Sequence, residues 1–143
     1  MKQIKFGIAG YGKMGKIREE SILNSPDAKL ISIYEVLEYA HYDTNIVQCN
    51  SFDELLTTDI DAVIVSAYVS VAAEYVIKAL NAGKHVFCEK PPSMTSKEMR
   101  KVIETEKKTG NVLKYGFNHR FHYSVMEAKK VVNDGKLGKM LWM

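Results

Sequence analysis

The chain of 143 residues lacks the features that several classes of protein require. Its only cysteines, Cys49 and Cys88, stand far apart and form no Cys/His spacing typical of a metal site. Two isolated thiols are typical of a reducing compartment. No apolar run is long enough to span a membrane, and glycine interrupts the N-terminal apolar run too early for a signal peptide. We therefore expect a cytoplasmic protein without a metal site or a membrane anchor.

An excess of one charge is also missing. The net charge is +3, and no Lys/Arg run forms the dense basic patch that nucleic-acid binding needs. Hydrophobic residues make up 46% of the chain, which is enough to bury a core and argues against disorder. The length suits one domain and leaves little room for a second.

Short apolar β runs alternate with amphipathic helical segments along the chain. The β runs cover residues 4–9, 30–34, 46–48, 62–65, 85–88 and 112–115. Helical patterns cover residues 13–23, 71–80 and 124–133, with two more that open near residues 51 and 95. Continuous apolar runs with a β-branched bias suit strands that are covered on both faces. We therefore predict an α/β fold, with a doubly wound parallel sheet between two layers of helices.

Two capping boxes define where helices begin. In Ser51–Glu54 and Thr95–Glu98 the hydroxyl can accept from a free amide while the glutamate reaches back. The second helix ends at Gly110 and is expected to turn Met99, Val102 and Ile103 inward.

A glycine motif follows the first strand and opens the first helix. Gly10, Gly12 and Gly15 form the spacing G-x-G-x-x-G in the strand–turn–helix context that a dinucleotide site needs. Gly10 allows a tight turn, Gly12 lets the backbone approach a pyrophosphate, and Gly15 allows close helix–strand packing. The free N–H groups of the helix N-terminus favour phosphate binding. The alternative is a turn in which the glycines serve packing alone.

An acidic partner for this motif stands at the end of the second β run. The carboxylate of Glu35 can accept hydrogen bonds from an adenosine ribose and would repel a 2′-phosphate. Its neighbours Val36 and Leu37 supply no cation for such a phosphate, so we predict NAD rather than NADP. Glu35 could instead be an ordinary surface glutamate. Lys13 could reach a phosphate or remain on the surface.

Polar residues also follow two later strands. Glu89-Lys90-Pro91 ends one of them, and Asn118, His119, Arg120 and His122 follow the next. Ligands of doubly wound sheets bind beyond the carboxyl ends of the strands. We therefore expect these clusters to converge with the glycine motif on one cleft.

Four segments together resemble one enzyme family. They are "GYGKMG", "AGKHVFCEKPPSMT", "YGFNHRFHYSV" and "NDGKLGKM", in this order. The order resembles the Gfo/Idh/MocA family (glucose–fructose oxidoreductase, inositol dehydrogenase) along essentially the whole chain, and E-K-P is its most specific part. The resemblance implies an N-terminal Rossmann domain joined to a C-terminal α/β substrate domain. It also implies an NAD(P)-dependent dehydrogenase that acts on a sugar, cyclitol or nucleotide sugar.

The resemblance assigns roles by position. It implies that Gly10, Tyr11, Gly12, Lys13, Met14 and Gly15 hold the pyrophosphate, that Glu35 holds the adenosine ribose and that Glu89 lies near the nicotinamide ribose. Lys90 would be the catalytic residue, binding the substrate hydroxyl or carbonyl and stabilising alkoxide charge. Pro91 is expected to follow a cis peptide bond.

Two further segments of the chain, one similar to the family pattern and one different from it, lie after strand ends. Asn118 and Arg120 match its N-x-R-F run, with Asn118 facing the cofactor and Arg120 binding an anionic substrate group or a structural ion pair. Where the family often has Thr-Pro-Asn, this chain has Ala67, Tyr68 and Val69. We expect Ala67 and Tyr68 still to line the cofactor, with Tyr68 stacking on a ring or packing.

The family's remaining catalytic pair, an Asp and a His, belongs to the second domain, outside this chain. We expect residues 1–120 to form the dinucleotide-binding domain, and residues 121–143 to form a connecting helix and a first strand of the absent domain. Hydride transfer needs both halves of the cleft, so we expect the fragment to be inactive alone. A dinucleotide-binding sensor or partner-binding module without catalysis stays an alternative, as does an NADP-dependent reductase. The apolar residues at 141–143 predict self-association into a homo-oligomer.

Overall fold

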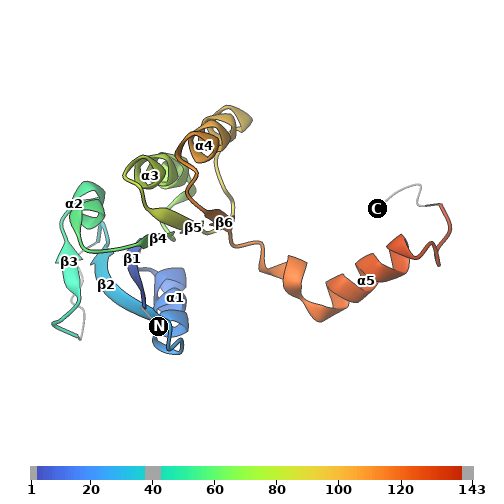
Figure 1. The fold of residues 1–143 in the computed structure, drawn as a ribbon, viewed down its shortest axis with the longest axis horizontal. Helices are drawn as coiled ribbons and strands as arrows, with labels where there is room; N and C mark the ends of the chain where they lie inside the picture. The colour runs from blue at the N-terminus through green and yellow to red at the C-terminus, as the bar shows by residue number, and fades with distance from the viewer. Residues whose placement is uncertain (1–2, 38–42, 140–143) are drawn as a thin grey trace.

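The computed structural model describes residues 3–37 and 43–139. Within them, six parallel strands form one sheet in the order β3-β2-β1-β4-β5-β6 (Figure 1). The strands are β1 (Ile4–Ala9), β2 (Ala28–Tyr34), β3 (Val47–Cys49), β4 (Ala62–Val65), β5 (His85–Cys88) and β6 (Leu113–Tyr115). The helices are α1 (Lys13–Leu23), α2 (Phe52–Thr57), α3 (Val69–Asn81), α4 (Ser96–Thr109), the 3-10 helix η1 (Asn118–Phe121) and α5 (Tyr123–Asn133). This is the Rossmann strand order, and it confirms the predicted doubly wound sheet.

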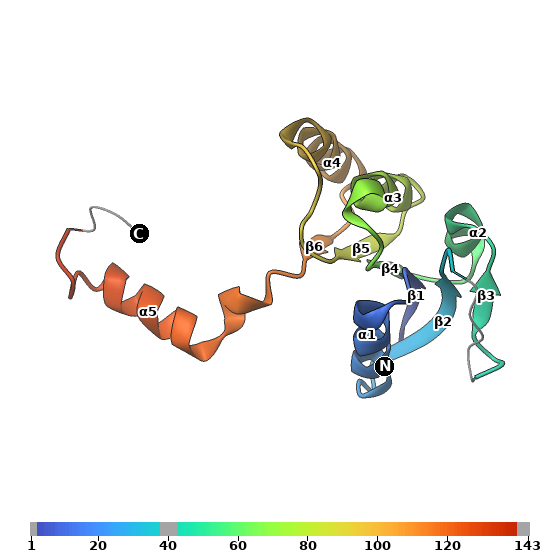
Figure 2. The ribbon, with the colours of Figure 1, turned by 180° about the vertical axis from the view of Figure 1, so that it is seen from behind.

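Helices cover the two faces of the sheet unequally. Helices α2, α3 and α4 pack on one face around a core that includes Leu55, Val76 and Val102, all fully buried. Helix α1 lies on the other face, where Ile8, Ile22 and Ile33 form a smaller core (Figure 2). The change of face between α1 and α3 places the ends of β1 and β4 at the point where the strand order reverses. In open α/β sheets, ligands bind in the crevice at this place.

The predicted caps are largely confirmed. The Thr95 hydroxyl accepts from Glu98 N at 3.2 Å, Glu98 reaches back to Thr95 N at 3.1 Å, and Gly110 ends the helix at a φ of 70°. At α2 the Ser51 hydroxyl caps as predicted, but Glu54 reaches one residue further back, to Asn50 N at 2.6 Å. The inward prediction was wrong for Ile103, which is 39% exposed because α4 turns only a narrow face to the core.

Helix α5 projects away from the sheet (Figure 1). None of its residues is buried, although its limits agree with the predicted helix. The predicted domain boundary between residues 120 and 121 falls inside η1. The predicted last strand and the apolar residues at 141–143 lie outside the described residues. No helix in the described part of the chain has the length and apolar character needed to cross a membrane.

Removing a buried side chain should test the packing of the larger core. Leu55 is fully buried between α2 and the sheet, so Leu55→Ala should lower the free energy of unfolding by about 2–5 kcal/mol through lost burial and the cavity left behind. Urea denaturation followed by circular dichroism measures this change. Leu23→Ala is the matched control, because Leu23 is 63% exposed and should cost less than about 1 kcal/mol. Equal losses in the two variants would contradict this account of the core.

Candidate functional site

A cavity of about 290 Å³ lies where the carboxyl ends of β1, β2 and β4 meet. It brings together five residues predicted from the sequence: Gly10, Gly12, Glu35, Ala67 and Tyr68. Its other lining residues are Tyr34, Val36, Leu37, Ser66, Val71 and Tyr75. The glycine motif and Glu35 thus meet in one cavity, whereas the Glu89-Lys90 and Asn118–Arg120 clusters, expected in the same cleft, do not line it.

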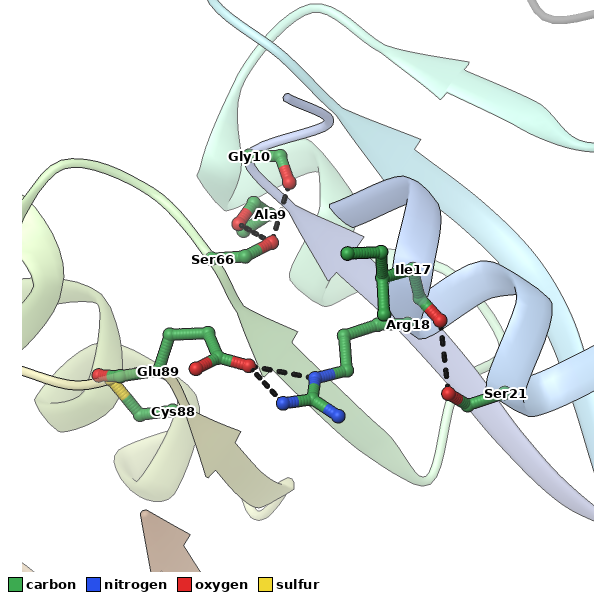
Figure 3. Close-up of polar contacts among 8 residues, drawn as sticks. All are labelled: Ala9, Gly10, Ile17, Arg18, Ser21, Ser66, Cys88 and Glu89. Carbon is green, nitrogen blue, oxygen red and sulfur yellow. Dashed lines mark hydrogen bonds and ion pairs between the residues drawn. The ribbon is translucent and has the colours of Figure 1, made fainter. Parts of the chain in front are cut away.

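The turn after β1 has no room for a side chain at Gly10. Its φ is +90°, a conformation that favours glycine, and a Cβ built there would lie 2.6 Å from the nitrogen of Ala67. Ser66 fixes this contact, since its hydroxyl donates to the carbonyl of Gly10 at 2.6 Å (Figure 3). On the other side, Gly10 N donates to the carbonyl of Tyr34 at 2.8 Å. The turn is thus held between β2 and the loop that follows β4.

The other two glycines of the motif meet different surroundings. A Cβ on Gly15 would collide with the carbonyl oxygen of Gly10, so this glycine allows α1 to start close to the turn. Gly12 is the N-cap of α1, with no side-chain cap, and a Cβ built on it has no atom within 4 Å. The first N–H groups of an α-helix have no partner within the helix. Gly12 therefore leaves the start of α1 open toward the cavity.

The remaining residues of the turn do not line the cavity. The side chain of Tyr11 is buried, and its hydroxyl hydrogen-bonds to the carboxylate of Glu19. Lys13 and Met14 are exposed on the first turn of α1. The main-chain N–H groups of Lys13 and Met14 lie in the first turn of α1, where N–H groups have no acceptor within the helix.

The carboxylate of Glu35 lies against the glycine turn. Its Oε2 accepts from Tyr11 N at 2.6 Å, and its Oε1 accepts from Val36 N at 2.8 Å and Leu37 N at 3.2 Å. A carboxylate offers about four acceptor positions, so three backbone donors leave one for a ligand. Glu35 is therefore both a clasp between β2 and the turn and an acceptor in the cavity wall.

Aromatic side chains form another part of the cavity wall. The ring of Tyr75 stacks on Phe52 at a centroid distance of 4.0 Å and lies 6.2 Å from the ring of Tyr34. Burial raises the pKa of the Tyr75 hydroxyl to about 12, so it stays uncharged at neutral pH. Tyr68 is 73% exposed at the cavity mouth. This wall suits a flat apolar group.

A second hollow, of about 390 Å³, lies beyond the ends of β5 and β6. It brings together the predicted residues Lys90, Asn118 and Arg120, and it is also lined by Gly116, Phe117 and His119. Lys90 is exposed, and the Lys90–Pro91 peptide bond is cis, as predicted. The guanidinium of Arg120 lies 5.3 Å from the centroid of the Phe117 ring.

Glu89 lines neither hollow and already has a charged partner. Arg18 of α1 donates from Nε to Glu89 Oε1 at 2.7 Å, and a second guanidinium nitrogen donates to the same oxygen (Figure 3). Sequence reasoning missed Arg18 because an arginine in an amphipathic helix is usually a surface residue. It also missed Tyr34 and Tyr75, since inward spacing on a strand or helix indicates burial without telling core from cavity wall. Ser66 was missed because it lies in the loop after β4, outside any periodic pattern.

Comparisons with known proteins agree with this geometry. A family model described as an oxidoreductase family with an NAD-binding Rossmann fold matches residues 4–117. The inositol 2-dehydrogenase of Rhizobium meliloti is 27% identical over 96% of this chain and 43% of its own length. The myo-inositol 2-dehydrogenase of Thermotoga maritima is 32% identical over 95% of this chain and 42% of its own length. The chain thus spans less than half the length of these relatives.

A solved structure shows the same arrangement. Scyllo-inositol dehydrogenase from Lactobacillus casei, with bound NAD(H) and scyllo-inositol, is 32% identical and superposes with a TM-score of 0.86. The match covers 96% of this chain and 43% of that one.

Alanine substitutions at Gly10 and Gly12 test which of the two glycines is required by close backbone packing. Gly10→Ala should lower the free energy of unfolding by about 2 kcal/mol or more, because the Cβ meets fixed backbone in a strained conformation. Gly12→Ala should cost less than about 1 kcal/mol, since its Cβ points into open space. Urea denaturation of both variants measures the difference. A Gly12→Ala variant as unstable as Gly10→Ala would refute the described turn.

Proposed function

The chain belongs to the Gfo/Idh/MocA family of oxidoreductases, and on this premise we propose that it binds NAD at the carboxyl ends of β1, β2 and β4. It is then the cofactor domain of a dehydrogenase that acts on a cyclitol or sugar. The observation that carries the proposal is the glycine turn held against the β4–α3 loop, with an open helix N-terminus beside a carboxylate.

Support for the diphosphate position comes from the start of α1. The helix begins at Gly12 without a side-chain cap and with open space where a Cβ would stand. Its unpaired N–H groups and partial positive charge favour a bound phosphate. In the proposed complex the N–H groups of Lys13, Met14 and Gly15 donate to the pyrophosphate oxygens.

Support for NAD rather than NADP comes from Glu35. One acceptor position of its carboxylate is left for an adenosine ribose hydroxyl, while a 2′-phosphate there would meet a like charge. The neighbouring side chains in the cavity wall, Val36 and Leu37, are apolar. The adenine then lies along the wall that Tyr75 and Tyr68 form, where a flat ring packs favourably.

Lys90 is proposed as the catalytic residue of the second hollow. NAD, when bound, supplies the acceptor for a hydride from a substrate carbon. The exposed ammonium of Lys90 donates a hydrogen bond to the substrate oxygen and stabilises the negative charge that develops on it. Asn118 and Arg120 line the same hollow, with Asn118 facing the nicotinamide and Arg120 the substrate.

The substrate class follows from the relatives. Those compared above act on inositols, and the chain covers only about 43% of their length. We infer a polyhydroxylated substrate, a cyclitol or a sugar, whose remaining contacts and whose Asp/His pair come from residues beyond this chain. These 143 residues then supply the cofactor side of the cleft.

Cofactor preference tests the proposal. Isothermal titration of the chain with NADH and NADPH should show NADH binding at least about tenfold more tightly, a difference of about 1.4 kcal/mol. Glu35→Gln keeps an acceptor for the turn but removes the charge. It should therefore weaken NADH binding about tenfold and reduce the ratio of NADH to NADPH affinity.

Glu104→Gln is the matched control, because Glu104 is exposed on α4 and does not line the cavity. It should bind both cofactors as the unmodified chain does. Tighter binding of NADPH by the unmodified chain would reverse the cofactor assignment. No binding of either cofactor would reject the proposed function.

A further inference from the structure

Arg18 makes a two-point contact with the end of β5. Phe87 and Glu89 are two residues apart, so their side chains lie on the same face of the strand. The guanidinium of Arg18 lies 4.8 Å from the centroid of the Phe87 ring. It also donates two hydrogen bonds to Glu89 Oε1, which Figure 3 shows. One side chain of α1 therefore contacts both Phe87 of β5 and Glu89, which follows the strand and precedes Lys90.

The carboxylate of Glu89 is enclosed on its other side as well. A Cβ on Gly116 would lie 2.7 Å from Glu89 Oε2, so a side chain there would displace the carboxylate from its present position. Gly116 N donates to the carbonyl of Cys88 at 2.9 Å, which holds Gly116 beside the end of β5. The side chains of Arg18 and Glu89 are only 17% and 11% exposed. Glu89 is thus confined between α1 and the end of β6.

This ion pair is poorly explained as a stability device alone. Burying two charges costs desolvation free energy, and well-packed apolar residues often stabilise a protein as much or more. Its place is more informative, because it joins the helix that starts at the proposed diphosphate site to the residue that precedes Lys90. Arg18 lies about 9 Å along the helix axis from Gly12, given a rise of 1.5 Å per residue.

We propose that Arg18 is a positioning residue for the nicotinamide half of the cofactor. Through Glu89 it sets the main chain and side chains at the end of β5, and so the wall against which the nicotinamide ribose lies. It leaves the adenosine half to the glycine turn and Glu35. The inference rests on the proposed function. It assigns a role to the ion pair between Arg18 and Glu89.

Comparing two ligands separates these halves. NADH carries the nicotinamide ribose and ring, whereas ADP carries the adenosine and the diphosphate but neither of these two groups. In isothermal titrations the unmodified chain should bind NADH about tenfold more tightly than ADP. Arg18→Gln should reduce this ratio to about one while leaving the Kd of ADP within about twofold. The emission shift of bound NADH, which reports on the nicotinamide surroundings, should decrease in parallel.

Conservative and paired variants exclude a general loss of structure. Arg18→Lys keeps the charge and should restore part of the NADH preference. Combining Arg18→Gln with Glu89→Gln should cost no more than either change alone, since the two residues act through one contact. Arg100→Gln, at an exposed arginine of α4, is the control and should leave the ratio unchanged.

Three results would overturn the inference. An Arg18→Gln variant that keeps the NADH preference shows that the ion pair does not act on the nicotinamide half. Equal weakening of ADP and NADH binding shows a role in folding instead. Equal binding of both ligands by the unmodified chain shows that the β5 end contributes nothing, while the proposed function stands. Failure of the unmodified chain to bind ADP rejects the proposed function itself.

Discussion

The absence of a side chain at Gly10 is the constraint on which the site depends. Backbone atoms of Ser66 and Ala67 occupy the place where a Cβ would stand, and the φ of +90° disfavours any residue with a Cβ. Because two loops from neighbouring strands touch through their main chains, the start of α1 is brought to the centre of the sheet edge. The cavity, the open helix N-terminus and the clasp by Glu35 all follow from that close approach.

Two carboxylates at strand ends are handled in different ways. Glu35 accepts from three backbone N–H groups and keeps an acceptor position facing a cavity. Glu89 is neutralised by the guanidinium of Arg18 and confined by Gly116. In the proposed complex the first arrangement leaves a negative charge to which a ribose hydroxyl donates. The second pairs the carboxylate that precedes Lys90 with a guanidinium.

The sequence predicted most of the fold, because the strands are continuous apolar runs and the helices carry recognisable caps. It also predicted the cavity through Gly10, Gly12 and Glu35, which follow rules of local geometry. It did not predict Arg18, since the partner of a helical arginine depends on which strand lies beside the helix. Nor did it distinguish Tyr75 as a cavity residue, because inward spacing is the same for core and wall. The inward assignment of Ile103 was wrong for a related reason: spacing gives a direction but not the width of the buried face.

The most direct measurement is a crystal structure of the chain grown with NADH. The account predicts the pyrophosphate on the N–H groups at the start of α1, an adenosine ribose hydroxyl donating to Glu35, and Glu89 still paired with Arg18. A dinucleotide bound elsewhere, or a cavity closed by the protein's own side chains with Glu35 making no contact to the ligand, would contradict it.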